Sequence, residues 1–301
     1  MRKFGYLVKR HCLVFLRDRM AVFFSLLSMI IIIVLMGMFL SKMNVDSIMS
    51  LLGQFRHTTS ADRANAGELV SYWTLAGILM TNALTVATSV IGIYIEDMRD
   101  HVLDCFYSAP VRRSVVSLSY IAAAMLMGML MCCLTLAVYL AFIVANGGRM
   151  LTVAHLLQVL GGTAVNVCLF SIMTYGVAIC LRRTQSWSAL ASMSGTLVGF
   201  LGGIYLPLGY LPSGVATFLK LLPFLNGAAI LRRSCVQDIA AETFRGCPDQ
   251  VLTEYQSYVG TTFPLNGHML TTPAQLGIMA LWGLFTLALI LAVTRRKHLS
   301  R

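Results

Sequence analysis

Residues 116–144 read VSLSYIAAAMLMGMLMCCLTLAVYLAFIV, and no charged residue occurs anywhere between Ser114 and Gly148. A helix that crosses the hydrocarbon core of a bilayer needs about 20 mainly apolar residues, because each residue rises about 1.5 Å. Of the 301 residues in the chain, 57% are hydrophobic and 12% are charged. A soluble domain is about one quarter charged. The composition therefore indicates an integral membrane protein.

Five further apolar segments accompany this one. They are continuously apolar, whereas the strands of a membrane barrel alternate in polarity over about ten residues. The first is expected to remain as a helix, because no small-residue cleavage site follows it. We predict an all-α integral membrane protein with six transmembrane helices in a single domain over 1–301, and loops such as 41–70 between them. The other five segments are 21–40, 72–95, 155–181, 188–206 and 274–294.

The distribution of charge predicts how the chain is oriented. With both termini cytoplasmic, the inside segments would be 1–20, 96–113, 182–187 and 295–301, and they hold 15 of the 23 Lys and Arg residues but only five of the 12 acids. Cytoplasmic loops of membrane proteins carry this excess of positive charge. The net charge of +11 is thus explained by orientation in the cell membrane and by contact with lipid headgroups, and it indicates no nucleic-acid partner.

The N-terminal segment has the pattern of an amphipathic helix. Phe4, Leu7, Val8, Cys12 and Phe15 recur at helical spacing, and basic residues occupy the opposite face. We expect an interfacial helix whose cations lie on anionic headgroups. The alternative is a basic flank that only orients the first span.

Segment 96–113 is rich in acids, although it is predicted to lie on the cytoplasmic side. On a helix Asp97, Asp100 and Asp104 share one face, and the apolar side chains form a ridge on another. This arrangement suggests a surface that docks a partner, and the alternative is a simple extension of the second span. The residues predicted to contact the partner are the acids Glu96, Asp97 and Asp100, the apolar Met98, Val102 and Phe106, and Pro110, which ends the helix.

Three prolines interrupt the apolar stretch after the fifth span. Pro207, Pro212 and Pro223 divide it into pieces too short to cross a membrane. Apolar segments of about 10–14 residues are more often re-entrant or interfacial than crossing. We therefore predict that 207–272 forms a re-entrant helical hairpin in the outer leaflet and then an outside loop, before the last span.

Polar side chains within the predicted spans have two possible roles. Asn82 and Asn166 are costly in hydrocarbon unless they bond across helices or face a cavity. They therefore indicate either contacts between packed helices or a substrate path, and the candidate path residues are Thr81, Asn82, Thr85, Asn166 and Tyr205. No Asp or Glu lies within a predicted span, which argues against an ion-coupled transporter.

The sequence carries no motif for catalysis. It lacks the Gly-x-x-x-x-Gly-Lys-Ser/Thr loop that binds ATP phosphates and the His-Glu-x-x-His motif that binds zinc. No pair among its eight cysteines has metal-binding spacing with His partners, so we predict no metal site. Cys235 and Cys247 fall in the same predicted outside loop, where they either form a disulfide or remain ordinary thiols.

Three of these features, taken in order, resemble the permease subunit of ABC type-2 exporters, and in particular its drug-exporter-like members. The resemblance covers the whole chain. The first feature is the basic amphipathic arm followed by six spans. The others are the acid-rich loop ending in Ser108-Ala109-Pro110-Val111-Arg112, and the Pro-marked segments Tyr205-Leu206-Pro207-Leu208, Leu211-Pro212 and Leu222-Pro223-Phe224.

The resemblance implies a half-transporter that moves an amphipathic, lipid-like, drug or peptide substrate out of the cytoplasm or the inner leaflet. Two permease copies, identical or related, would pair. A separate nucleotide-binding ATPase subunit, which holds the ATP and Mg²⁺, would dock on a coupling helix in 96–113. The chain itself would bind no cofactor and would not be an enzyme. The alternatives are a non-transporting regulatory or assembly subunit and an ion-coupled secondary transporter.

Overall fold

A computed structural model describes residues 2–35, 41–181, 183–203, 208–265 and 268–299. Within these ranges the chain is almost entirely helical, as predicted, apart from one short antiparallel hairpin. The elements are α1 (Arg2–Arg17), α2 (Arg19–Leu35), α3 (Ser41–Gly53), α4 (Ser60–Arg99), α5 (Val102–Ser108), α6 (Arg113–Ala145), α7 (Val153–Ala178), α8 (Thr184–Leu201), the 3₁₀ turn η2 (Leu208–Tyr210), α9 (Ser213–Leu221), α10 (Pro223–Thr243), α11 (Asp249–Tyr258), β1 (Pro264–Leu265), β2 (His268–Met269) and α12 (Thr272–Leu299).

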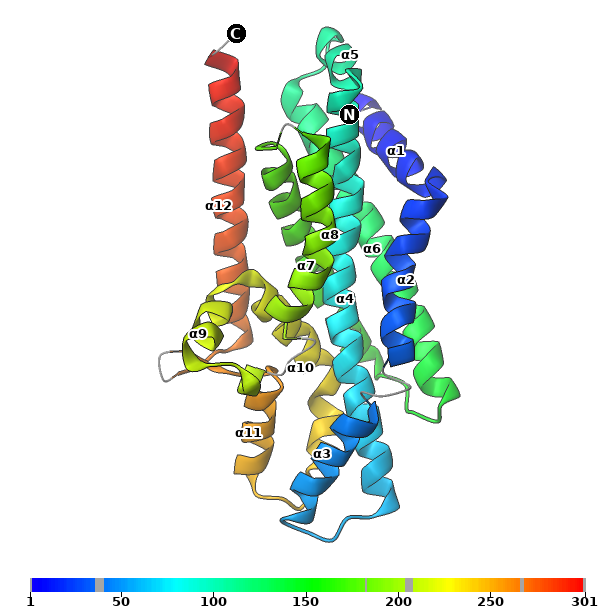
Figure 1. The fold of residues 1–301 in the computed structure, drawn as a ribbon, viewed down its shortest axis with the longest axis vertical. Helices are drawn as coiled ribbons and strands as arrows, with labels where there is room; N and C mark the ends of the chain where they lie inside the picture. The colour runs from blue at the N-terminus through cyan, green and yellow to red at the C-terminus, as the bar shows by residue number, and fades with distance from the viewer. Residues whose placement is uncertain (1, 36–40, 182, 204–207, 266–267, 300–301) are drawn as a thin grey trace.

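Helix α4 forms the centre of the bundle. It is buried along most of its length, because α6, α7, α8 and α10 pack around it (Figure 1). Its first turn is fixed by a capping box in which the Thr59 hydroxyl accepts from the Asp62 N–H and the Asp62 carboxylate accepts from the Thr59 N–H. A helix of 40 residues is about 60 Å long, so α4 extends beyond the predicted second span at both ends.

Several described helices are long and apolar enough to cross a membrane. Four meet this condition alone, namely α4, α6, α7 and α12 up to Thr294, and α9 with α10 meets it as a pair bent by 80°. The predicted spans 21–40 and 188–206 overlap α2 and α8, which are not among these candidates, and the ends of both predicted spans, 36–40 and 204–207, lie outside the described residues. The described part of the chain is therefore a multi-pass membrane protein with four or five candidate spans.

Two segments predicted to be loops are largely helical. In 41–70, α3 forms because Val45, Ile48 and Leu52 lie on one face and pack into the core shared with α4. The segment after residue 233 continues α10 as far as Thr243, because no Gly or Pro interrupts it before Gly246. Both of these predicted loops therefore contain helices.

Helices α9 and α10 begin directly after Pro212 and at Pro223, two of the three prolines at which breaks are predicted. Pro212 lies directly before α9 and Pro223 occupies the first turn of α10, where the missing N–H would have no partner within the helix. Together with the 80° bend between α9 and α10, these positions give the segment two separate helical pieces. Pro207 lies outside the described residues.

The two ends of the bundle carry different elements. Figure 1 shows α5, the start of α1 and the carboxyl end of α12 at one end of the long axis, which we call the α5 end, and α3 and α11 at the opposite end, the α11 end. Three of the four segments predicted to lie on one side of the membrane are therefore represented at the same end, by the start of α1, by α5 and by the last turn of α12.

Candidate functional site

The connection between α4 and α6 contains a short helix, α5. Helix α4 ends at Arg99, and His101 adopts a left-handed conformation with φ 60° and ψ 14°, which turns the chain before α5 begins. Leu103 is buried and anchors α5 on the bundle. The apolar ridge predicted on one continuous helix is consequently divided, with Met98 on α4 and Val102 and Phe106 on α5.

Asp97, near the end of α4, faces the interior of the protein. Its carboxylate accepts two hydrogen bonds from the guanidinium of Arg10 in α1, of which the one from Nη2 is 2.7 Å long, and a third from the hydroxyl of Tyr120 in α6 at 2.5 Å. Only 7% of the Asp97 side chain is exposed, and a buried carboxylate needs such partners because its desolvation is costly. Asp97 thus joins three helices, which removes it from the partner-facing set that the sequence predicts.

His11 extends this cluster. Its Nε2 lies 3.1 Å from the hydroxyl oxygen of Ser119, and its ring stacks on Tyr120 with the ring centres 3.8 Å apart. The side chain is fully buried. Burial, with a smaller contribution from the charge of Arg10, lowers the pKa of His11 to about 4, so the ring is neutral at pH 7.

Two further contacts join α1 to α5 and to the segment that follows it. The guanidinium carbon of Arg10 lies 5.4 Å from the centre of the Phe106 ring, and Lys3 Nζ donates to the carbonyl oxygen of Pro110 at 3.0 Å. Two basic groups of the N-terminal arm, expected to lie on lipid headgroups, are therefore bonded to protein. These contacts join α1 to Phe106 of α5 and to Pro110, two residues after α5 ends.

The surface left exposed around α5 is polar and charged. Arg99 pairs with Asp100 at 2.7 Å, and His101 lies 3.0 Å from the carboxylate of Asp104. Among the residues predicted to contact a partner, the apolar ones are partly covered, while the charged ones other than Asp97 face outward. The exposed residues of the predicted set are Glu96, Asp100 and Pro110, and the partly buried ones are Met98, Val102 and Phe106.

The asparagines within the spans connect helices. Asn82 Nδ2 in α4 donates to the Thr135 hydroxyl oxygen of α6 at 2.7 Å. Asn166 Nδ2 in α7 donates to the carbonyl oxygen of Gly227 in α10 at 3.3 Å. Both asparagines are fully buried, and these contacts match the first of the two roles predicted for them, the packing of helices.

The remaining predicted residues have local roles or lie outside the described ranges. Thr81 and Thr85 donate to carbonyl oxygens of α4 itself, and Tyr205 is not among the described residues. Cys235 and Cys247 are both free, which matches the alternative of two ordinary thiols. In the described part of the chain, no three His, Cys, Asp or Glu side chains gather closely enough to hold a metal ion.

Arg232 has a role that the sequence analysis misses. It is the largest fully buried side chain of the structure, and its guanidinium donates to the carbonyl oxygens of Gly202, Gly203 and Val259 at 2.7–3.1 Å. The group also stacks over Trp73 at 5.0 Å. The signal that could have revealed it is an arginine next to the apolar run Ala-Ala-Ile-Leu of α10. Arg232 ties the end of α8 and the segment after α11 to the centre of the bundle.

Comparison with known families decides the identity. Residues 2–234, from α1 into α10, match the family model described as ABC-2 type transporter. The chain belongs to this family. The ABC-2 match includes α5 and its contacts with α1, and ends before α11, the hairpin and α12. An ABC-2 membrane domain is a transport permease and is not itself catalytic. Comparison with curated proteins gives no match.

Proposed function

We propose that this ABC-2 chain is the permease half of an ATP-driven exporter, and that a separate ATPase subunit docks on α5 from the cytoplasm. The observation that carries the proposal is the position of α5, a short helix bonded to α1 within the part of the chain that matches the family. The excess of Lys and Arg in 1–20 and 295–301 supports the α5 end as the cytoplasmic one. ATP and Mg²⁺ would be held by the partner.

The chemistry of the exposed surface suggests how docking works. Glu96, Asp100 and Asp104 are exposed acids on this surface, and they would pair with basic side chains of a partner. Movement of the docked subunit would reach α1 through Arg10 and Lys3. To shift the ratio of the two conformations of a permease from 1:99 to 99:1, a partner must bind the favoured conformation about 5.5 kcal/mol more tightly than the other. A nucleotide-driven partner can supply this difference.

The same proposal covers the architecture in the membrane. We take α2 and α8 as the two additional spans and the bent pair α9–α10 as the re-entrant hairpin, which gives six spans with both termini in the cytoplasm. Exposed leucines on α12, including Leu281, Leu284 and Leu291, suit contact with lipid or with a second permease copy. The amides of Asn82 and Asn166 bond to other helices of the same copy. We therefore place the path of an amphipathic, lipid-like, drug or peptide substrate between two copies.

Recovery of an ATPase tests this function. The tagged chain is crosslinked in its host and purified in mild detergent, and vanadate-sensitive ATP hydrolysis is measured on the eluate. We expect Asp104→Arg to reduce the recovered ATPase at least tenfold. Asp249→Arg makes the same charge change on α11 at the other end of the bundle and should leave recovery unchanged. An eluate without an ATPase would refute the permease proposal, and equal recovery from both variants would refute docking on α5.

A further inference from the structure

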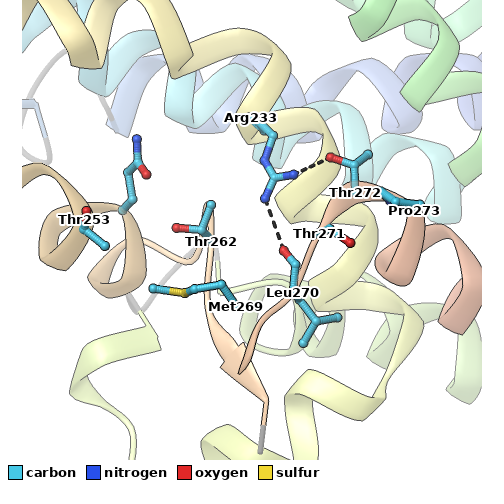
Figure 2. A pocket seen from close by; sticks show the side chains of 9 residues that line it. Arg233, Thr253, Thr262, Met269, Leu270, Thr271, Thr272 and Pro273 are labelled. Carbon is cyan, nitrogen blue, oxygen red and sulfur yellow. Dashed lines mark hydrogen bonds between the residues drawn. The ribbon is translucent and has the colours of Figure 1, made fainter. Parts of the chain in front are cut away.

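Two adjoining cavities lie at the α11 end, between α10, α11 and the segment that leads from the hairpin into α12. Their volumes are about 470 and 200 Å³, and they share Arg233, Gln256 and Thr262 in their lining. Figure 2 shows Arg233 reaching from α10 toward Leu270 and Thr272, with Thr262 between the arginine and Thr253 of α11. The two cavities therefore adjoin at these three residues.

Arg233 brings a positive charge into this site without a counter-ion. It is the charged residue in the lining of both cavities, and no acid lines either of them. Within the described ranges, no carboxylate lies at ion-pair distance from Arg233. Its guanidinium donates to the Thr272 hydroxyl oxygen and to the Leu270 carbonyl oxygen at 3.4 Å, which leaves some of its five N–H donors for a ligand. An anion would compensate this half-buried charge.

The rest of the lining offers donors around the same space. Thr261 is 3% exposed and lines the smaller cavity, and its hydroxyl has no hydrogen-bond partner in the described part of the chain. A buried hydroxyl without a partner is unfavourable, so a ligand oxygen beside it would stabilise the site. Thr262 and Gln256, which carry a hydroxyl and an amide, line both cavities. An anion with several oxygens can use such a dispersed set of donors better than a single carboxylate can.

The larger cavity also has an apolar edge. Met269, Leu270 and Pro273 line it, and α12, a candidate span, begins at Thr272. The site is therefore beside a helix that enters the membrane, where a phosphate attached to acyl chains could reach Arg233 while its chains stay in the bilayer.

We propose that these joined cavities bind a phosphate group, held by Arg233 and the neighbouring threonine hydroxyls. The phosphate belongs either to the headgroup of a phospholipid in the adjacent leaflet or to a free phosphate ion. The site lies at the end of the bundle opposite α5, so the proposal does not depend on the docking of an ATPase.

Binding to the purified full-length chain in detergent tests the site. Native mass spectrometry measures the affinity for dioleoyl phosphatidylglycerol and for dioleoylglycerol, which lacks the phosphate, and calorimetry measures the affinity for inorganic phosphate. We expect either a preference of at least tenfold for phosphatidylglycerol, which identifies the lipid as the source, or saturable binding of inorganic phosphate, which identifies the free ion. Arg233→Gln should weaken that binding at least tenfold.

Matched variants distinguish the site from general charge effects. Arg245→Gln removes an exposed positive charge after α10 that lines neither cavity, and should change the affinity less than twofold. Thr262→Val keeps the shape of the wall and should weaken binding about threefold, which provides a test even if Arg233→Gln does not fold. The proposal is overturned if neither phosphate source binds, if Arg233→Gln and Thr262→Val both bind as the wild type does, or if Arg245→Gln loses as much affinity as Arg233→Gln.

Discussion

Replacement of Arg10 by glutamine should release α1 from the end of α4. Removing one partner of a fully buried ion pair costs roughly 3–5 kcal/mol, because the other charge stays buried alone. The side chain of Arg10 is 34% exposed, and Asp97 keeps its hydrogen bond from Tyr120, so water and this bond offset part of the loss. We estimate a cost of about 2 kcal/mol for the docking of α1, which is a roughly 30-fold increase in the undocked population.

Hydrogen exchange measures this population directly. In the purified chain in lipid nanodiscs, the amides of α1 should exchange about 30-fold faster in Arg10→Gln than in the wild type, as expected when exchange proceeds through undocking that is about 2 kcal/mol easier. Lys9→Gln is the matched control, because it removes an exposed positive charge from the same helix. It should leave the exchange of α1 unchanged.

The double variant Arg10→Gln/Asp97→Asn separates the ion pair from packing. With no charge left buried, it should recover most of the protection that Arg10→Gln loses. The reasoning is refuted if Arg10→Gln exchanges like the wild type, or if the double variant is destabilised by the sum of the two single changes.

Two further predictions concern His11 and Gly227. Burial lowers the pKa of His11 from 6.5 to about 4, so the undocked state binds more protons between these two pH values. Docking of α1, measured by hydrogen exchange, should therefore weaken as the pH drops from about 6.5 toward 4 and stay constant above that range. The variant His11→Gln should lose this pH dependence. A Cβ at Gly227 would lie 2.0 Å from Asn166 Oδ1, so Gly227→Ala should destabilise the contact between α7 and α10 by about 1–3 kcal/mol in thermal unfolding, whereas Gly161→Ala, whose Cβ meets open space, should not. An unchanged melting midpoint for Gly227→Ala would contradict the packing described for Asn166.

The amino-acid sequence alone determined the class of fold and its local breaks. An uncharged run such as 116–144 must be helical in hydrocarbon, because every backbone polar group there needs a partner within its own segment. Pro212 and Pro223 stand at the starts of α9 and α10, because proline lacks an N–H and has a restricted φ, both of which suit the start of a helix. These effects act within a few residues, so they can be predicted without knowing what lies nearby.

Only the tertiary structure decided what each helical face meets. Asp97 and Asp104 lie on the same face of the predicted helix. In the structure, however, Asp97 is buried against Arg10, which is 87 positions away in the sequence, and Asp104 is exposed. Arg232 reads in the sequence as one more basic residue, but the folded chain surrounds it with carbonyl oxygens and Trp73. The periodicity of the sequence predicts which side chains share a helix face. The partners that a buried charged group needs come from residues far away in the sequence, which only folding brings close.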